Sequence, residues 1–266
     1  GPGEERVSLL LAAESSSFIR FNRGAVRQAT HVDQAIATLA LAQGRRHAEV
    51  RVALGGRVDA DVARLRAELE ALRAMLPALA DDPYLLLPDA PAHSERHDSG
   101  ELPDEGAVVQ AVTRVAAGLD FVGFYAGGPV VRAFADSLGS RHWHHVQTFH
   151  FDWCLYHAAD KAVKTAYAGS RWSEDEFTRR VAEGTRQLAV MARPPRVLAP
   201  GAYRAWFTPT AMAELLGALA WGGFGLKERR TGTSTLMRLA HRDAVLHPDV
   251  ALSEHTALGP APAFTA

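Results

Sequence analysis

Residues 7–43 read VSLLLAAESSSFIRFNRGAVRQATHVDQAIATLALAQ, and this stretch decides the fold. Its first part contains short apolar and β-prone runs, at 7–12, 18–22 and 26–30. Between the last two runs lies Asn22-Arg23-Gly24, where the glycine supplies the backbone freedom that a tight turn needs. From 34 to 43 the side chains alternate between two sides of the chain. Short alternating runs with turn residues between them predict an antiparallel meander.

An amphipathic helix is predicted after a turn at Gly44-Arg45-Arg46 and one more strand at 47–54. Its apolar residues recur at alternating spacings of four and three, and they are Val58, Val62, Leu65, Leu69, Leu72, Leu76 and Leu79. That spacing places them on one stripe of a helix, which we expect to pack on the meander. Pro77 is expected to kink or end this helix.

The remainder of the chain mixes strands and helices without strict alternation. The proline-broken stretch 83–103 is expected to be an exposed, mobile linker. Ser173 and Glu176 form a capping box that predicts a helix start, and Thr208-Pro209 predicts another, running through Trp221. Further elements are expected as a helix at 106–117 and strands at 121–125, 130–135, 142–156, 163–168 and 203–207, with Gly127-Gly128-Pro129 joining the first two strands.

These elements predict an α+β fold. We expect an N-terminal domain at 4–193, in which an antiparallel meander carries packed helices. A mainly β C-terminal domain is expected to begin at 194 and to be incomplete at 266. The length of 266 residues and the 47% hydrophobic content suffice for a sizeable core.

Charge and cysteine content exclude some classes of function. Lys and Arg number 29 and Asp and Glu number 30, so a general phosphate-binding surface has no support and nucleic acid is not an expected partner. The single cysteine, Cys154, cannot form an internal disulfide, which fits a reducing compartment. No apolar run approaches the length of a membrane span. We therefore expect a cytoplasmic protein without a membrane partner.

Common catalytic motifs are absent from the sequence. It contains no phosphate-binding glycine loop, dinucleotide fingerprint, Gly-x-Ser-x-Gly elbow or His-Glu-x-x-His helix. The best metal candidate is a histidine-rich strand at 142–157. On a strand His150, Asp152 and Cys154 share one face, and these residue types ligate zinc. The alternating Phe149, Phe151 and Trp153 favour the simpler interpretation of one apolar and one mixed face.

Four segments in order carry a resemblance to a known family. They are the glycine-rich run 123–139 ending in Asp136-Ser137-Leu138-Gly139, the strand-like run 162–169, the stretch 199–216 and the short segment 233–236. The stretch 199–216 contains Pro200-Gly201-Ala202-Tyr203 and then Pro209. Together the segments resemble the TldD/PmbA peptidase family, also called modulators of DNA gyrase.

The resemblance implies a role without a zinc site in this chain. Zinc-bearing members of the family carry His-Glu-x-x-x-His on the helix after the Pro-Gly-x-Tyr strand, whereas residues 218–228 here contain no histidine. The chain is therefore similar to the TldE/PmbA-like members. By resemblance it is a non-catalytic subunit of a heterodimeric zinc metalloprotease that acts on unfolded peptides or peptide precursors. Its expected partners are a TldD-like subunit, which holds the zinc, and the peptide.

Two alternatives remain open from the sequence. The chain is a peptidase in its own right, with zinc on the His-rich strand, or it is a non-enzymatic peptide-binding regulator. For a peptide ligand we expect pairing with the strands at 121–135 and 142–156. Tyr125, Trp143 and Trp153 are the candidate substrate-binding residues. No catalytic residue and no resident cofactor are assigned to this chain.

Overall fold

A computed structural model describes residues 4–158, 161–255 and 259–264. They fall into two compact units. The first contains the residues up to Pro195 together with 259–264, and the second is Arg196–His255. Within the described residues, no helix is both long and apolar enough to cross a bilayer.

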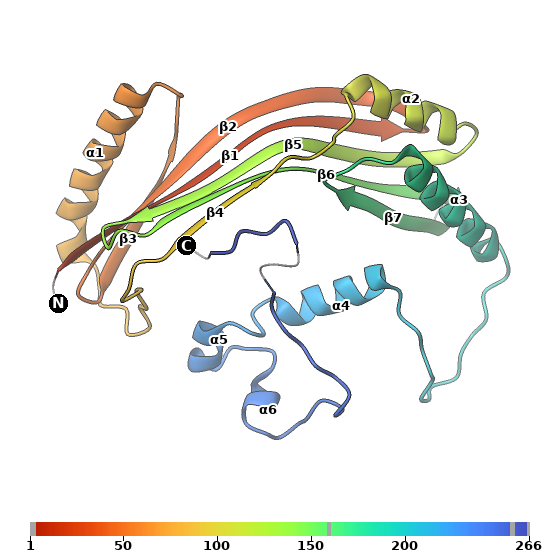
Figure 1. Ribbon diagram of the computed structural model, residues 1–266. Helices are drawn as coiled ribbons and strands as arrows, with labels where there is room; N and C mark the ends of the chain where they lie inside the picture. The colour runs from red at the N-terminus through yellow and green to blue at the C-terminus, as the bar shows by residue number, and fades with distance from the viewer. Residues whose placement is uncertain (1–3, 159–160, 256–258, 265–266) are drawn as a thin grey trace. The chain divides into compact units, whose positions relative to one another are not determined.

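The first unit is built on one sheet with unusually long, curved strands (Figure 1). Its strand order is β3-β2-β1-β5-β6-β4, and β7 pairs with the second half of β6. All pairs are antiparallel except β4 with β6. The strands are β1 (Glu5–Asn22), β2 (Ala25–Gln43), β3 (Arg46–Ala53), β4 (His93–Asp98), β5 (Asp120–Asp136), β6 (Arg141–Ala158) and β7 (Lys161–Gly169).

Three helices pack on one side of this sheet, which we call the helix face. The helix α1 (Val58–Met75) and the short 3-10 turn Leu76–Ala78 cover Val7 and Leu9 of β1. At the other end, α2 (Glu105–Val115) and α3 (Glu174–Met191) cover Ile19 and Phe21 of the same strand. These four β1 residues have odd numbers, and successive side chains of a strand point to opposite sides. Both helical layers therefore lie on the same face, and the other side is the second face.

Aromatic side chains dominate the core beneath α2 and α3. Phe121, Phe151 and Trp153 lie on neighbouring strands with ring centroids 5.1–6.1 Å apart. Phe177 of α3 stacks on Phe151 at 5.4 Å. Aromatic pairs at these distances add to the burial of apolar area, which at about 25 cal/mol per Å² is the main stabilising contribution.

The expected short strands of the meander are in fact continuous. β1 and β2 each join two predicted runs, and β5 crosses Gly127 and Gly128 without a turn. At Gly128 a Cβ atom would lie 2.1 Å from the carbonyl oxygen of Ser15, so these glycines allow close approach of β5 to β1. The prediction of a turn at Gly127-Gly128-Pro129 is therefore wrong.

The stretch 83–103 is also different from the expected mobile linker. It contains β4, which pairs in parallel with β6 from Arg141 to Val146. Its polar residues, including His93 and Glu95, lie on an edge strand of the sheet, where polar side chains reach solvent. The residues of β4 alternate between exposed and half-buried, but all six are polar, so no apolar alternation is present for a sequence pattern to reveal.

The second unit contains α4 (Pro209–Ala220), α5 (Leu226–Thr231) and α6 (Met237–Ala240). The predicted start of α4 is confirmed, because the Thr208 hydroxyl accepts from the amide of Ala211 and Pro209 occupies the first turn. The α+β class is confirmed. The expected strand at 203–207 is wrong, and the described part of 194–266 contains no strand, so the expectation of a mainly β region is wrong for these residues.

The turn between β1 and β2 gives a test of the fold. Gly24 has φ +70°, and a Cβ there would lie 3.2 Å from Ala116. Gly44 has φ +62° with open space around it. We expect Gly44→Ala to lower the free energy of unfolding by about 1 kcal/mol through backbone strain. Gly24→Ala should cost about 1 kcal/mol more because of the contact. Urea denaturation measures both, and equal losses would contradict this packing of the turn against α2.

Candidate peptide-binding surface

One edge of the sheet offers backbone groups to a further strand. β3 pairs with β2 only from Ile36 onward, while β1 pairs with β2 along its whole length. Among the described residues, none pairs with the outer side of residues 25–34. An exposed strand edge presents N–H and C=O groups that an extended peptide can pair with, and such pairing gives affinity without sequence dependence.

The second face carries an apolar pocket beside this edge. Phe18 and Phe124 stack there with ring centroids 5.8 Å apart, and the Arg20 guanidinium lies 5.7 Å from the centroid of Phe124. With Gln28, Thr30 and Val32 of β2 these residues line a pocket of about 320 Å³. The three β2 residues belong to the free edge. Every second side chain of an added strand would therefore project over the pocket.

The same edge carries a polar cluster on the helix face. The Ser15 and Ser17 hydroxyls lie 3.1 and 3.3 Å from the two ring nitrogens of His31. His31 Nε2 also lies 3.4 Å from Asp33. The hydrogen bond from Ser15, followed by the contribution of His31, holds the pKa of Asp33 below its ordinary value. The set contains a serine, a histidine and an acid, which is the composition of a nucleophilic triad.

The geometry of this cluster does not support nucleophilic catalysis. The Ser17 hydroxyl donates to Glu105 Oε1 at 2.6 Å, so its proton is directed away from His31. Ser15 and Asp33 lie near the same ring nitrogen, whereas a triad needs the nucleophile and the orienting acid on opposite nitrogens. His31 and Asp33 are also open to solvent. The cluster is a hydrogen-bonded surface feature of the edge.

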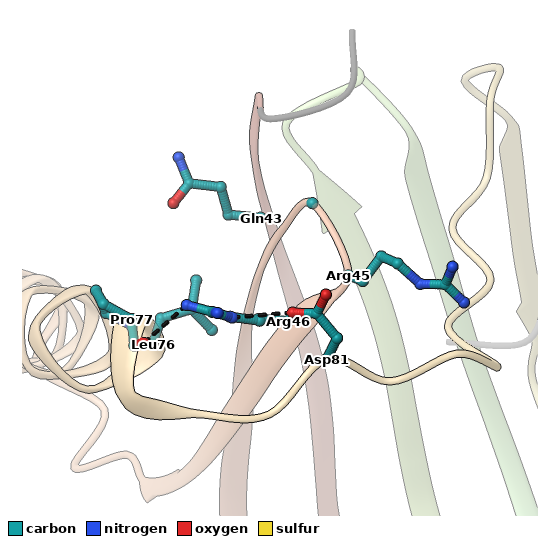
Figure 2. Close-up of a pocket in the computed structure, with 7 residues that line it drawn as sticks. Gln43, Arg45, Arg46, Leu76, Pro77 and Asp81 are labelled. Carbon is teal, nitrogen blue, oxygen red and sulfur yellow. Dashed lines mark hydrogen bonds and ion pairs between the residues drawn. The ribbon is translucent and has the colours of Figure 1, made fainter.

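A larger cavity, of about 410 Å³, lies at the turn between β2 and β3 (Figure 2). Arg46 crosses it and donates to the Asp81 carboxylate at 3.0 Å and to the Pro77 carbonyl at 2.7 Å. Figure 2 shows the Arg45 guanidinium pointing to the opposite side from Arg46. The charge of Arg46 is thus already paired with a carboxylate that lines the cavity.

Two of the three predicted substrate-binding residues lie in the core. Tyr125 and Trp153 are 2% and 1% exposed beneath α2 and α3. Burial, followed by the charge of Glu105, raises the pKa of Tyr125 to about 12. A peptide could contact either ring only if the helices moved. Trp143 is 40% exposed, and lies on the helix face with its ring 6.4 Å from His97 of β4.

The histidine-rich strand is β6, and the structure separates its members. His142, His144 and His150 lie on the second face, whereas His145 lies on the helix face with Val131. His150 Nδ1 lies 3.7 Å from Asp152, and Cys154 is the next residue on that face. His144 and His150 are six residues apart, which is roughly 20 Å along a strand. Among the described residues, no group of three or more His, Cys, Asp or Glu is placed to hold a metal ion.

The predicted pairing of a peptide with strands 121–135 and 142–156 is wrong. β5 is already paired with β1 and β6 on its two sides, and β6 is paired with β5 and then with β4 or β7. Sequence reasoning missed residues 25–34 as the free edge. The only signal was the absence of a large apolar side chain other than Val26 and Val32 in this stretch.

Comparison with known proteins gives matches by structure alone. No family model and no curated protein matches the sequence. TldE from Thermococcus kodakarensis is similar over 69% of this chain, with a TM-score of 0.57 and 8% identity. A candidate modulator of DNA gyrase from Bacteroides thetaiotaomicron is similar over 68% of it, with a TM-score of 0.52 and 12% identity. The chain has a TldE-type fold.

The TldE-type fold confirms the fold that the sequence resemblance predicts. The matched part spans less than half of the two solved chains, 44% of TldE and 45% of the second protein. At 8–12% identity the likeness concerns the fold, and the activity of those proteins does not transfer with it.

Proposed function

We propose that this chain is a non-catalytic, TldE-like member of the TldD/PmbA family. In this proposal it pairs with a TldD-like subunit that holds zinc, and the assembly cleaves unfolded peptides or peptide precursors in the cytoplasm. The observation that carries the proposal is the TldE-type fold of a chain that lacks a His-Glu-x-x-x-His helix. The task of this subunit is then to bind and orient the peptide.

The free edge of β2 and the adjacent aromatic pocket suit that task. Backbone pairing with residues 25–34 accepts any extended sequence without proline at the pairing positions. The pocket of Phe18 and Phe124 favours a peptide with a large apolar side chain at one position. A subunit with these two features selects unfolded chains over folded ones, since a folded protein keeps its strand backbone paired internally.

The alternative of an independent zinc peptidase lacks an arranged ligand set among the described residues. The regulator alternative uses the same peptide-binding surface but requires no zinc-bearing partner. Metal content and activity after mixing therefore separate the three hypotheses.

Zinc content is the first test of the pairing. The purified chain should contain no stoichiometric zinc by elemental analysis. Mixed with a His-Glu-x-x-x-His relative from the same genome, it should form a zinc-containing complex that cleaves an unfolded peptide. Stoichiometric zinc in the chain alone would support the independent peptidase instead. A stable complex without any peptidase activity would support the regulator.

The pocket makes a second prediction for the active complex. Phe124→Ala removes half of the aromatic pair and should raise KM for an unfolded peptide about tenfold, because buried aromatic contacts carry much of the binding energy at interfaces. The value of kcat should stay within about twofold, since the zinc lies in the other subunit. Val122→Ala is the control, because Val122 lies on the same face of β5 but outside the pocket. Equal effects of the two variants, or a loss of kcat alone, would contradict peptide binding here.

A further inference from the structure

A second place on the second face already contains a piece of the same chain. Residues 259–264 follow the second unit in sequence but belong to the first, where they lie against β4 and β6 (Figure 1). Their sequence is Gly-Pro-Ala-Pro-Ala-Phe. This segment forms neither helix nor strand, so side chains of the sheet, rather than backbone pairing, hold it.

Side chains of the sheet recognise three successive carbonyl groups of this segment. Arg96 Nη1 of β4 donates to the Gly259 oxygen at 2.6 Å and reaches the Ala261 oxygen at 3.5 Å. His144 Nε2 of β6 donates to the Pro260 oxygen at 3.0 Å. Every peptide has carbonyl groups at this spacing, so these contacts accept many sequences. Hydrogen bonds from a charged guanidinium are also stronger than those between neutral groups.

The end of the segment is held by an aromatic contact. The Phe264 ring stacks on His142 with centroids 4.8 Å apart and planes at 19°, and it lies 6.5 Å from the ring of Phe134. The Ser94 hydroxyl lies 2.7 Å from His142 Nδ1, which fixes the orientation of the imidazole. This subsite therefore distinguishes an aromatic side chain from a small one.

Arg96 is oriented by a contact outside the segment, and His144 is buried. Asp98 accepts a hydrogen bond from Arg96 Nε at 2.6 Å and orients the guanidinium. His144 is 2% exposed, and its Nδ1 has no hydrogen-bond partner among the described residues. A buried polar atom without a partner is uncommon in folded proteins.

We infer that Arg96, His144, His142 and Phe134 form a binding site for unfolded peptide segments that carry an aromatic residue, and that residues 259–264 occupy it as an internal ligand. The inference rests on the proposed function, because it adds a second peptide subsite to the same subunit. The first subsite, at the β2 edge, binds backbone. The second selects an aromatic side chain and binds backbone carbonyl groups three to five residues before it.

Internal occupancy changes how strongly a free peptide binds. A tethered segment competes at an effective concentration in the millimolar range. The apparent affinity for a free peptide is reduced by the fraction of molecules whose site is occupied. Weakening the internal contact must therefore strengthen the binding of a free peptide, whereas a merely structural contact would show no such relation.

Fluorescence anisotropy of a labelled Gly-Pro-Ala-Pro-Ala-Phe peptide tests the inference on the full chain, without zinc or a partner subunit. Phe264→Ala removes the aromatic anchor of the internal ligand and should lower the Kd for this probe about tenfold relative to the unaltered chain. In the Phe264→Ala background, Arg96→Ala should weaken binding at least tenfold. Glu95→Ala is the matched control, because Glu95 precedes Arg96 on β4 and points to the helix face.

A second probe, in which alanine replaces the phenylalanine, needs no change in the site and so avoids any effect on folding. It should bind the Phe264→Ala chain at least tenfold more weakly than the first probe. An unchanged Kd after Phe264→Ala, equal binding of the two probes, or equal effects of Arg96→Ala and Glu95→Ala would overturn the inference. The pairing with a zinc-bearing subunit is read by metal content, so either proposal can fail while the other stands.

Discussion

The unbroken register between β1 and β5 is the constraint on which the rest of the structure depends. The two strands pair from Ser8 with Asp136 to Asn22 with Val122 without a shift of register. A shift of one residue would move every side chain to the other face of the sheet. Because none occurs, α1 at one end and α2 with α3 at the other cover the same face. The pairing is interrupted only at Ser15 and Ser16, where Gly128 lies so close to β1 that any side chain would meet its backbone, and the same register resumes beyond.

The same alternation of odd- and even-numbered residues determines which side chains lie on the second face. The even-numbered residues of β1 and β5, including Phe18, Phe124 and Phe134, point away from the three helices. At one end of this face, aromatic side chains lie near solvent. At the other end, an arginine and histidines contact a segment of the chain. Both are features of a surface that binds peptide. The β2 edge adds backbone groups beside the aromatic end. The proposal that this chain binds peptide as one subunit of a complex rests on this arrangement and on the TldE-type fold.

Patterns within short stretches of the sequence predicted the longer helices, capped helix starts and the first hairpin turn. The apolar spacing corresponds to α1, and its part from Leu65 to Leu76 packs on the sheet as expected, whereas Val58 and Val62 are exposed. The turn at Gly24 and the capping residues Ser173 and Thr208 correspond to the first hairpin, α3 and α4. Strand length and pairing were not predictable in this way, because they depend on residues far apart in sequence. Gly127 and Gly128 signal a turn in isolation, and only the proximity of β1 explains them as a close approach. Tyr125 and Trp153 suggested binding residues by type, but their strand neighbours place them in the core.

The central claim, that an unfolded peptide adds to the free edge of β2, is tested most directly by amide hydrogen exchange. The measurement compares the complex with a TldD-like subunit whose His-Glu-x-x-x-His glutamate is changed to glutamine, with and without a saturating unfolded peptide. We predict slower exchange at alternate amides within residues 25–34 and unchanged exchange along the outer edge of β3, with which no other strand of the described residues pairs. Unchanged exchange at residues 25–34 while the peptide is bound would contradict the account.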